Sequence, residues 1–231
     1  MIERDTLQYF RNPAAGEELL LATKWNHYFD VYDSHFSKYV GQSPKVLEMG
    51  VYQGGSLKMW EQYFRKGATV VGIDIFPGTI KLRDVGLNVH LGSQVDAGFL
   101  RQLTEEYGPW DIVIDDASHR TSHQIESFLL FMQPGWMAEN STYLIEDTHT
   151  SEWPEYTDAG ADLYKTMYDV VRSLNGWHVR NGEQAPPIAE AACPAMTKQT
   201  TSVAFYDSII VVERGQHVRP GRCANGGKGL V

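Results

Sequence analysis

The chain has 231 residues, 42% hydrophobic and 21% charged, which is the composition of a globular protein with a sizeable core. Its formal net charge of −9 disfavours a nucleic-acid partner, because binding to phosphate backbones requires a basic surface. No apolar run approaches the roughly 20 residues that cross a bilayer, and the N-terminus lacks the basic-then-apolar pattern of a secretory signal. Cys193 and Cys223 show no metal-type spacing, so we expect free thiols in a cytoplasmic protein without membrane contact.

The apolar pattern predicts a helical N-terminal extension over residues 1–44, followed by alternating strands and helices. Apolar positions recur at helical spacing from Leu19 to Tyr39, and Gly41 and Pro44 end the extension. Strands are then predicted at residues 45–50, 68–74, 89–91, 111–115 and 142–146. Helices are predicted at residues 56–65, 96–107, 124–132 and 163–174. Residues 202–206 and 208–213 predict an antiparallel hairpin that turns at Asp207.

This alternation favours an α/β fold. We expect a single doubly wound, Rossmann-like domain over residues 45–215, with a mainly parallel sheet and the hairpin at one edge. The glycine-rich residues 216–231 are expected to form a flexible tail. Doubly wound sheets bind ligands beyond the carboxyl ends of their strands. The residues that follow each strand are therefore the candidate site.

A glycine-rich loop follows the first predicted strand. Gly50 and Gly54 allow a tight strand-to-helix turn and a close approach of a ligand to the backbone. The spacing G-x-x-x-G-G differs from the G-x-G-x-x-G of loops that hold a pyrophosphate. A loop that is opened by the carboxylate of Glu48 suits a cation instead. A purely structural turn is the alternative.

The next two strand ends favour a nucleoside. Asp74 ends the second predicted strand, where a carboxylate can accept hydrogen bonds from both hydroxyls of a ribose. A helix cap or a solvated strand end is the alternative for this residue. Residues 92–94, Gly-Ser-Gln, follow the third strand and place polar side chains where they could reach an adenine edge.

The pattern E-x-G-x-x-x-G at residues 48–54, followed by Asp74 and by residues 92–94, resembles the class I S-adenosylmethionine-dependent methyltransferases. The runs VLEMGVYQGGSLKMW, DDASHR and IEDTHTS resemble a narrower group. That group holds the macrocin and mycinamicin sugar O-methyltransferases, their rhamnosyl relatives and a cephalosporin-tailoring protein (cephalosporin hydroxylase group). Many relatives carry an acidic residue where this chain has Ser93.

The resemblance implies methyl transfer from S-adenosylmethionine to a hydroxyl, here a sugar hydroxyl of a glycosylated natural product such as an antibiotic. The residues expected around the cofactor are Glu48, Gly50, Tyr52, Gly54, Ser56, Asp74, Ile75, Ser93, Gln94 and Asp115.

Two acidic doublets, Asp115-Asp116 and Glu146-Asp147, end the fourth and fifth predicted strands. Adjacent strands lie about 4.8 Å apart, so the doublets converge and would repel each other strongly without a cation. Hard oxygen ligands favour Mg²⁺ or a similar divalent ion. We expect Asp116, Glu146 and Asp147 to bind the metal, and Asp115 to support the cofactor or the fold. Capping of the following helices is the alternative, but it explains only one carboxylate per strand.

Histidines near the doublets are the candidate catalytic bases. His119 could take a proton from a hydroxyl, and a metal on that hydroxyl would stabilise the alkoxide. A histidine in the matching position is the proposed base of the mycinamicin-type relatives, so the resemblance implies that role for His119. Support of the metal ligands is its alternative role. His149 is the competing candidate and could orient the substrate, whereas His123 is expected to be structural.

Two other functions stay open. A nicotinamide-dependent oxidoreductase could use a similar sheet, although the glycine spacing and the lack of a Tyr-x-x-x-Lys pair speak against it. The cephalosporin-tailoring relative is described as working with a partner protein, so a binding role is the second alternative. Aromatic residues at 25–32 and 153–168 could form walls that exclude water, or serve as core or as contacts of a homo-oligomer.

Overall fold

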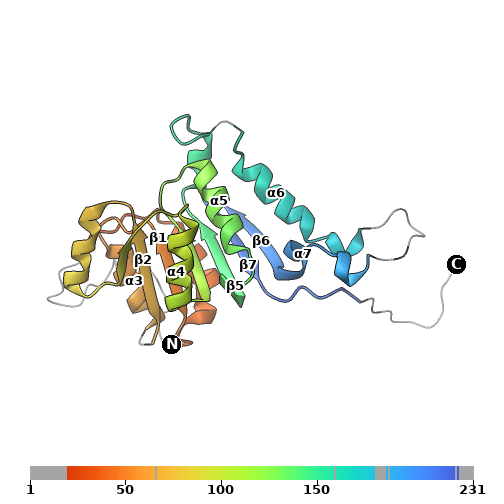
Figure 1. Ribbon diagram of the computed structural model, residues 1–231, viewed down its shortest axis with the longest axis horizontal. Coiled ribbons are helices and arrows are strands. Elements are labelled where there is room, and N and C mark those ends of the chain that lie inside the picture. The colour runs from red at the N-terminus through yellow and green to blue at the C-terminus, as the bar shows by residue number, and fades with distance from the viewer. Residues whose placement is uncertain are drawn as a thin grey trace.

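The computed structural model describes residues 20–65, 67–158, 160–179, 186, 188–221 and 223. Its strands form one seven-stranded sheet in the order β3-β2-β1-β4-β5-β7-β6 (Figure 1). The strands are β1 (Lys45–Met49), β2 (Thr69–Asp74), β3 (Val89–Leu91), β4 (Trp110–Asp115), β5 (Met137–Ile145), β6 (Thr200–Tyr206) and β7 (Ile209–Arg214). Neighbouring strands from β3 to β5 are parallel, whereas β7 is antiparallel to both β5 and β6. The predicted doubly wound sheet with an antiparallel edge hairpin is therefore confirmed.

The helices lie in the connections between these strands, except for α2 and η1, which precede β1. The α-helices are α2 (Tyr28–Phe36), α3 (Gly55–Phe64), α4 (Ala97–Tyr107), α5 (Thr121–Phe131), α6 (Leu163–Ser173) and α7 (Ala195–Gln199). Short 3₁₀ turns are η1 (Ser37–Tyr39), η2 (Pro77–Val85), η3 (Thr148–Glu152), η4 (Gly176–His178) and η5 (Glu190–Ala192). Within the described ranges, no helix combines the length and the apolar character needed to span a membrane.

The expected N-terminal helix is only partly correct. The helix begins at Tyr28, and residues 20–25 have no regular secondary structure. These residues instead run across the carboxyl edge of the sheet, where Lys24 makes ion pairs with strand-end carboxylates. Such long-range contacts outweigh a local helical preference. The predictions for residues 1–19 and 224–231 lie outside the described residues.

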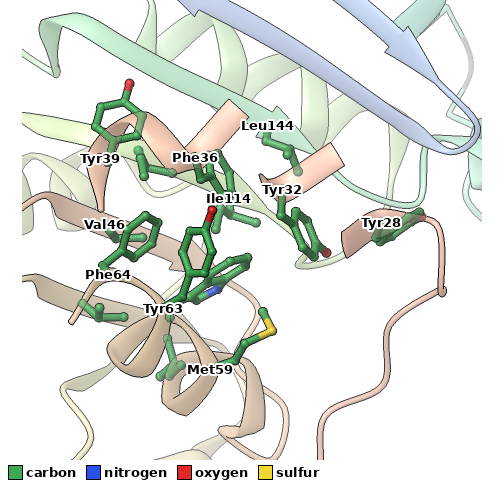
Figure 2. Close-up of a cluster of buried hydrophobic side chains, with 14 of the residues drawn as sticks. Tyr28, Tyr32, Phe36, Tyr39, Val46, Met59, Tyr63, Phe64, Ile114 and Leu144 are labelled. Carbon is green, nitrogen blue, oxygen red and sulfur yellow. The ribbon is translucent and has the colours of Figure 1, made fainter. Parts of the chain in front are cut away.

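Each face of the sheet carries its own hydrophobic cluster. One cluster joins α2 and α3 to the sheet, and Figure 2 shows Tyr32 and Phe36 of α2 beside Ile114 and Leu144 of the strands. The ring of Tyr32 stacks in parallel on that of Phe36. It meets the ring of Trp60 edge-on, and the Tyr32 and Trp60 centroids are 5.0 Å apart. The other cluster joins α4, α5 and α6 to the opposite face, and α4 and α5 cross the near face in Figure 1.

Alternation along the strands decides which face each strand-end side chain reaches. Ile112 and Ile114 of β4 belong to the cluster with α2 and α3, whereas Val113 belongs to the cluster with α4 and α5. Because successive strand residues point to opposite faces, Asp115 points to the same face as Val113, and Asp116 points to the same face as Ile114. The two neighbouring aspartates are therefore directed to opposite sides of the sheet.

Candidate functional site

The glycine loop after β1 is held against the end of β4. Gly50 has φ +96°, and a Cβ added to it would lie 2.0 Å from the carbonyl oxygen of Asp116. A side chain at this position would therefore collide with the backbone of the neighbouring strand end. Gly54 has φ +80° and stands at the start of α3. The loop geometry thus requires glycine at the two positions that the sequence analysis singled out.

Asp74, at the end of β2, organises the same loop. Its Oδ2 accepts hydrogen bonds from the backbone N–H groups of Val51 and Tyr52, at 3.0 and 3.1 Å. Its Oδ1 accepts a hydrogen bond from the backbone N–H of Phe76 at 2.8 Å. Three backbone donors on one carboxylate fix the path of the glycine loop over the sheet edge.

Three neighbouring cavities lie over the carboxyl ends of the strands. The large cavity, about 590 Å³, is bounded by residues 21–24, the glycine loop, Asp74 and the strand end at Asp116. The adjoining cavity, about 130 Å³, shares Gly50 and Asp74 with it. The third cavity, about 240 Å³, shares Lys24, Asp116 and Asp147 with the large cavity. Asp116 and Asp147 thus stand between two hollows.

The predicted cofactor residues divide into three groups by position. Four line the large cavity: Gly50, Tyr52, Ser56 and Asp74. The adjoining cavity contains Ile75, Ser93 and Gln94, together with Gly50 and Asp74. The remaining predicted cofactor residues, which border none of these cavities, are Glu48, Gly54 and Asp115.

Asp115 is buried on the α4 and α5 face and is surrounded by neutral donors. Gln94 Nε2 donates to its Oδ1 at 2.9 Å, and Ser127 Oγ and Tyr143 OH donate to its Oδ2 at 2.7 and 3.2 Å. Burial raises the pKa of Asp115, although these hydrogen bonds oppose the shift. Hydrogen bonds thus hold the Asp115 side chain in the protein interior. Asp115 also orients Gln94, whose Oε1 accepts a hydrogen bond from the backbone N–H of Ser118.

Lys24 gathers the carboxylates on the other face. Its Nζ lies 2.5 Å from Asp116 Oδ2 and 2.8 Å from Glu146 Oε2, and 3.8 Å from Glu48 Oε1. These carboxylates follow or belong to β4, β5 and β1, and the Lys24 side chain is only 4% exposed. The Lys24 ammonium is therefore surrounded mainly by carboxylates and has little contact with bulk water.

Burial and mutual repulsion dominate the electrostatics of this cluster. Burial alone would lower the pKa of Lys24, but Asp116, Glu146 and Glu48 raise it well above its usual value. Burial raises the pKa of Glu48 to about 7 despite the ammonium. Burial, with Asp116 close by, also raises the pKa of Glu146. One ammonium thus does not fully offset burial and repulsion among the three carboxyl groups, and a further cation would favour their ionised form.

Asp147 and His119 complete a potential cation site beside Asp116. One oxygen or ring nitrogen from each of Asp116, His119 and Asp147 lies within 4.8 Å of the others. His119 Nε2 is 3.6 Å from Asp147 Oδ2 and 4.0 Å from Asp116 Oδ1. His119 and Asp147 have φ +56° and +53°, in the left-handed region that costs energy outside glycine. Strained backbone at two such residues is typical of functional sites.

Glu146, the third predicted metal ligand, has both oxygens engaged by the chain. Tyr32 OH donates to its Oε1 at 2.7 Å, and Lys24 contacts its Oε2. Tyr28 OH donates to Asp147 Oδ1 at 2.5 Å, which leaves Oδ2 facing His119. Two tyrosines of α2 therefore orient carboxylates from the end of β5.

The second candidate histidine lies on the other side of Asp147. His149 Nδ1 is hydrogen-bonded with Ser208 Oγ and lies 4.0 Å from Asp147 Oδ1. Its ring meets Trp153 and Trp25 edge-on, with centroids 4.9 and 6.2 Å apart. His123, expected to be structural, is hydrogen-bonded with Ser118 at 2.9 Å and also borders the adjoining cavity.

Sequence reasoning missed Lys24. A single lysine gives no signal in the sequence, because its carboxylate partners are 92 and 122 positions away. Tyr28 and Tyr32 were expected only as wall, core or oligomer contacts, whereas Tyr28 also donates a hydrogen bond to Asp147 of the potential cation site and Tyr32 donates one to the neighbouring Glu146.

The chain is similar to sugar O-methyltransferases along most of its length. It is 35% identical over 204 residues to 8-demethyl-8-(2-methoxy-alpha-L-rhamnosyl)-tetracenomycin-C 3'-O-methyltransferase of Streptomyces olivaceus, covering 84% of this chain and 50% of the relative. It is 30% identical over 205 residues to mycinamicin VI 2''-O-methyltransferase of Micromonospora griseorubida, covering 80% of this chain and 47% of the relative. The chain thus spans about half the length of the curated relatives it matches. No protein-family profile matches it.

The fold agrees with a solved structure of this group. The methyltransferase MycE of the mycinamycin biosynthetic pathway, in complex with Mg and S-adenosylhomocysteine, superposes with a TM-score of 0.70 at 28% identity. The match covers 87% of this chain and 52% of MycE. The fold is therefore that of a class I S-adenosylmethionine-dependent methyltransferase. Within that class, the chain is a homologue of the macrocin- and mycinamicin-type sugar O-methyltransferases.

Proposed function

We propose that this chain is a metal-dependent O-methyltransferase that moves a methyl group from S-adenosylmethionine to a sugar hydroxyl of a glycosylated natural product. The observation that carries the proposal is the grouping of Asp116, His119 and Asp147 where the large cavity ends. The relatives that methylate tetracenomycin and mycinamicin sugars support the reaction class. The complex of MycE with Mg and S-adenosylhomocysteine supports the pair of cofactors.

The donor atoms fit a divalent ion. Asp116 and Asp147 each offer a carboxylate oxygen near His119 Nε2, and hard oxygen donors suit Mg²⁺. We assign the direct contacts to Asp116 and Asp147, with Glu146, held by Lys24 and Tyr32, as the third predicted ligand beside them. When bound, the ion would make an acceptor hydroxyl more acidic, and S-adenosylmethionine would supply an electrophilic methyl group.

His119 is the proposed base. Its Nε2 faces the two aspartates, where an acceptor hydroxyl would lie, so it can take the hydroxyl proton. The oxygen then forms a bond to the methyl carbon as the carbon–sulfur bond breaks, and the sulfur leaves as a neutral thioether. His149, which faces the other oxygen of Asp147, is assigned to substrate orientation. Most of the rate gain should come from holding the two reactants in line.

We assign the cofactor and the acceptor to different cavities. Asp74 would bind the ribose, and Ser93 and Gln94 of the adjoining cavity would meet the adenine. The acceptor sugar would enter the third cavity, whose wall includes Trp25 and Tyr28. Aromatic walls suit the apolar faces of a sugar and its aglycone. Asp116 and Asp147 line both the large and the third cavity, so the two reactants would meet there.

A methyl-transfer assay with the purified single chain tests this function. Labelled S-adenosylmethionine is incubated with rhamnosylated and macrolide glycosides, and the products are identified by mass spectrometry. We expect transfer to a sugar hydroxyl that EDTA abolishes and excess Mg²⁺ restores. Full activity in EDTA would contradict the metal requirement. Binding of S-adenosylhomocysteine without transfer to any glycoside would favour a protein that needs a partner, and a thermal shift with a nicotinamide cofactor alone would favour an oxidoreductase.

A cytoplasmic location is part of the same proposal. Cys193 is buried, Cys223 is exposed, and both are free thiols. Unpaired cysteines are typical of proteins kept in a reducing compartment. S-adenosylmethionine is also made and used inside cells, which agrees with this location.

A further inference from the structure

Residues 20–25 form an N-terminal strap that crosses the carboxyl edge of the sheet. The strap has no regular secondary structure, yet residues 21–24 all line the large cavity. It is therefore a wall of that cavity made from the chain segment that precedes α2. A wall without helical or strand hydrogen bonds needs other contacts to stay in place.

The first contact that holds the strap is with the start of α3. A Cβ added to Gly55 would lie 2.6 Å from the backbone nitrogen of Ala22 and 2.6 Å from the carbonyl oxygen of Leu20. The strap backbone thus lies directly on the helix start, at a distance that only a residue without a side chain permits. Leu20 also packs against the hydrophobic cluster of α2 and α3.

The second contact is the ammonium of Lys24. It bridges Asp116 and Glu146 at 2.5 and 2.8 Å and lies 3.8 Å from Glu48. Without this positive charge, three carboxylates from neighbouring strand ends would face one another with little solvent between them. Glu48 and Glu146 are almost fully buried, so water could not replace the ammonium. The same charge that fixes the carboxylates therefore also holds the strap.

We propose that Lys24 is a positioning residue for the methyl-donor site: its ammonium orients Asp116 and Glu146 and keeps the strap in place as a wall of the large cavity. This inference rests on the proposed function, because the donor is assigned to that cavity. Lys24 lines the cavity but takes no part in the proton or methyl transfer. Its effect is exerted through the two carboxylates and the strap.

The test measures the affinity for S-adenosylhomocysteine by calorimetry, well below the melting temperature of each variant. Lys24→Met keeps the length of the side chain and removes its charge, and we expect at least about tenfold weaker binding. Lys24→Arg keeps the charge and should recover much of that loss. Lys38→Met is the matched control, because Lys38 also pairs with a strand carboxylate, Glu213 at 2.5 Å, but lines none of the three cavities. Its affinity should equal that of the wild type.

Gly55→Ala tests the strap without changing any charge. The added methyl group must displace the backbone at residues 20–22, so binding should again weaken. Wild-type affinity in Lys24→Met overturns the inference, and if that variant does not fold, wild-type affinity in Gly55→Ala overturns it. Equal weakening in Lys24→Met and Lys38→Met would also overturn it, because the effect would then be general destabilisation. Failure of the wild-type chain itself to bind S-adenosylhomocysteine would refute the proposed function instead.

Discussion

Asp115 and Asp116 are neighbours in the sequence but lie in different electrostatic surroundings. Asp115 is fully buried among the neutral donors of Gln94, Ser127 and Tyr143. Asp116 is partly exposed at the rim of two cavities, beside the Lys24 ammonium and the ring of His119. The alternation of the strand alone sends them to opposite faces.

The difference shows that the two aspartates of one acidic doublet can have different roles. Neutral donors surround Asp115, and it lines none of the three cavities, so we assign it a structural role. The cluster around Asp116 contains more carboxylates than nearby cations, which leaves it able to accept one more positive charge. Excess charge beside a cavity distinguishes a candidate reaction site from a buried polar network.

The sharpest test of this comparison is Asp116→Asn. We expect methyl transfer to fall by about 1,000-fold or more, because the substitution removes a charged ligand from the cation site. Asp116 also pairs with the buried Lys24 ammonium, so the melting temperature should fall as well, and turnover is compared at a temperature where the variant is folded. Turnover and melting temperature are measured on the same preparation. Near-normal turnover would contradict the assignment of Asp116 to the cation site.

His119→Ala should have the next largest effect. Loss of the proposed base should reduce turnover by about 100-fold, while the affinity for S-adenosylhomocysteine stays unchanged. His149→Ala serves as the paired variant, because His149 lies at a similar distance from the other oxygen of Asp147. We expect it to raise the KM for the acceptor more than it lowers kcat. If His149→Ala instead lowered turnover more and His119→Ala mainly raised the KM for the acceptor, His149 would be the base and His119 would orient the substrate.

Asp115→Asn should act mainly on stability. An asparagine offers one acceptor oxygen and places an NH₂ group against donors that Asp115 now accepts from, so we expect a loss of about 1–3 kcal/mol. Chemical denaturation measures the change. Turnover at a temperature where the variant is folded should stay within a few-fold of the wild type. A loss of turnover as severe as that of Asp116→Asn, in a stable protein, would contradict the structural role.

Glu213 provides a smaller, pH-dependent test, because it has charged neighbours but borders none of the three cavities. Burial would raise its pKa, but His35 and Lys38 lower it below its usual value. A carboxyl whose pKa is lower in the folded state stabilises the fold above its unfolded pKa, and the contribution disappears as the pH falls through the folded pKa. The stability difference between the wild type and Glu213→Gln should therefore shrink on acidification below about pH 4. A difference that stays constant or grows would contradict the shift.

The sequence predicted the sheet and the strand-end residues because both depend on local patterns. Short apolar runs, glycine turns and acidic doublets can be read directly, and Val89–Leu91 was predicted with its observed bounds. The strap could not be predicted, because residues 20–25 are shaped by Gly55 and by carboxylates far along the chain. The engagement of Glu146 by Tyr32 and Lys24 was equally hidden, since it depends on how α2 and the strap meet the sheet.

Titration with Mn²⁺, followed by electron paramagnetic resonance, tests the proposed cation site most directly. The wild-type chain and Asp115→Asn should each bind one ion with similar affinity, whereas Asp116→Asn should bind it far more weakly. Indistinguishable Mn²⁺ binding by the wild type and Asp116→Asn would contradict the assignment of this acidic cluster as the metal site.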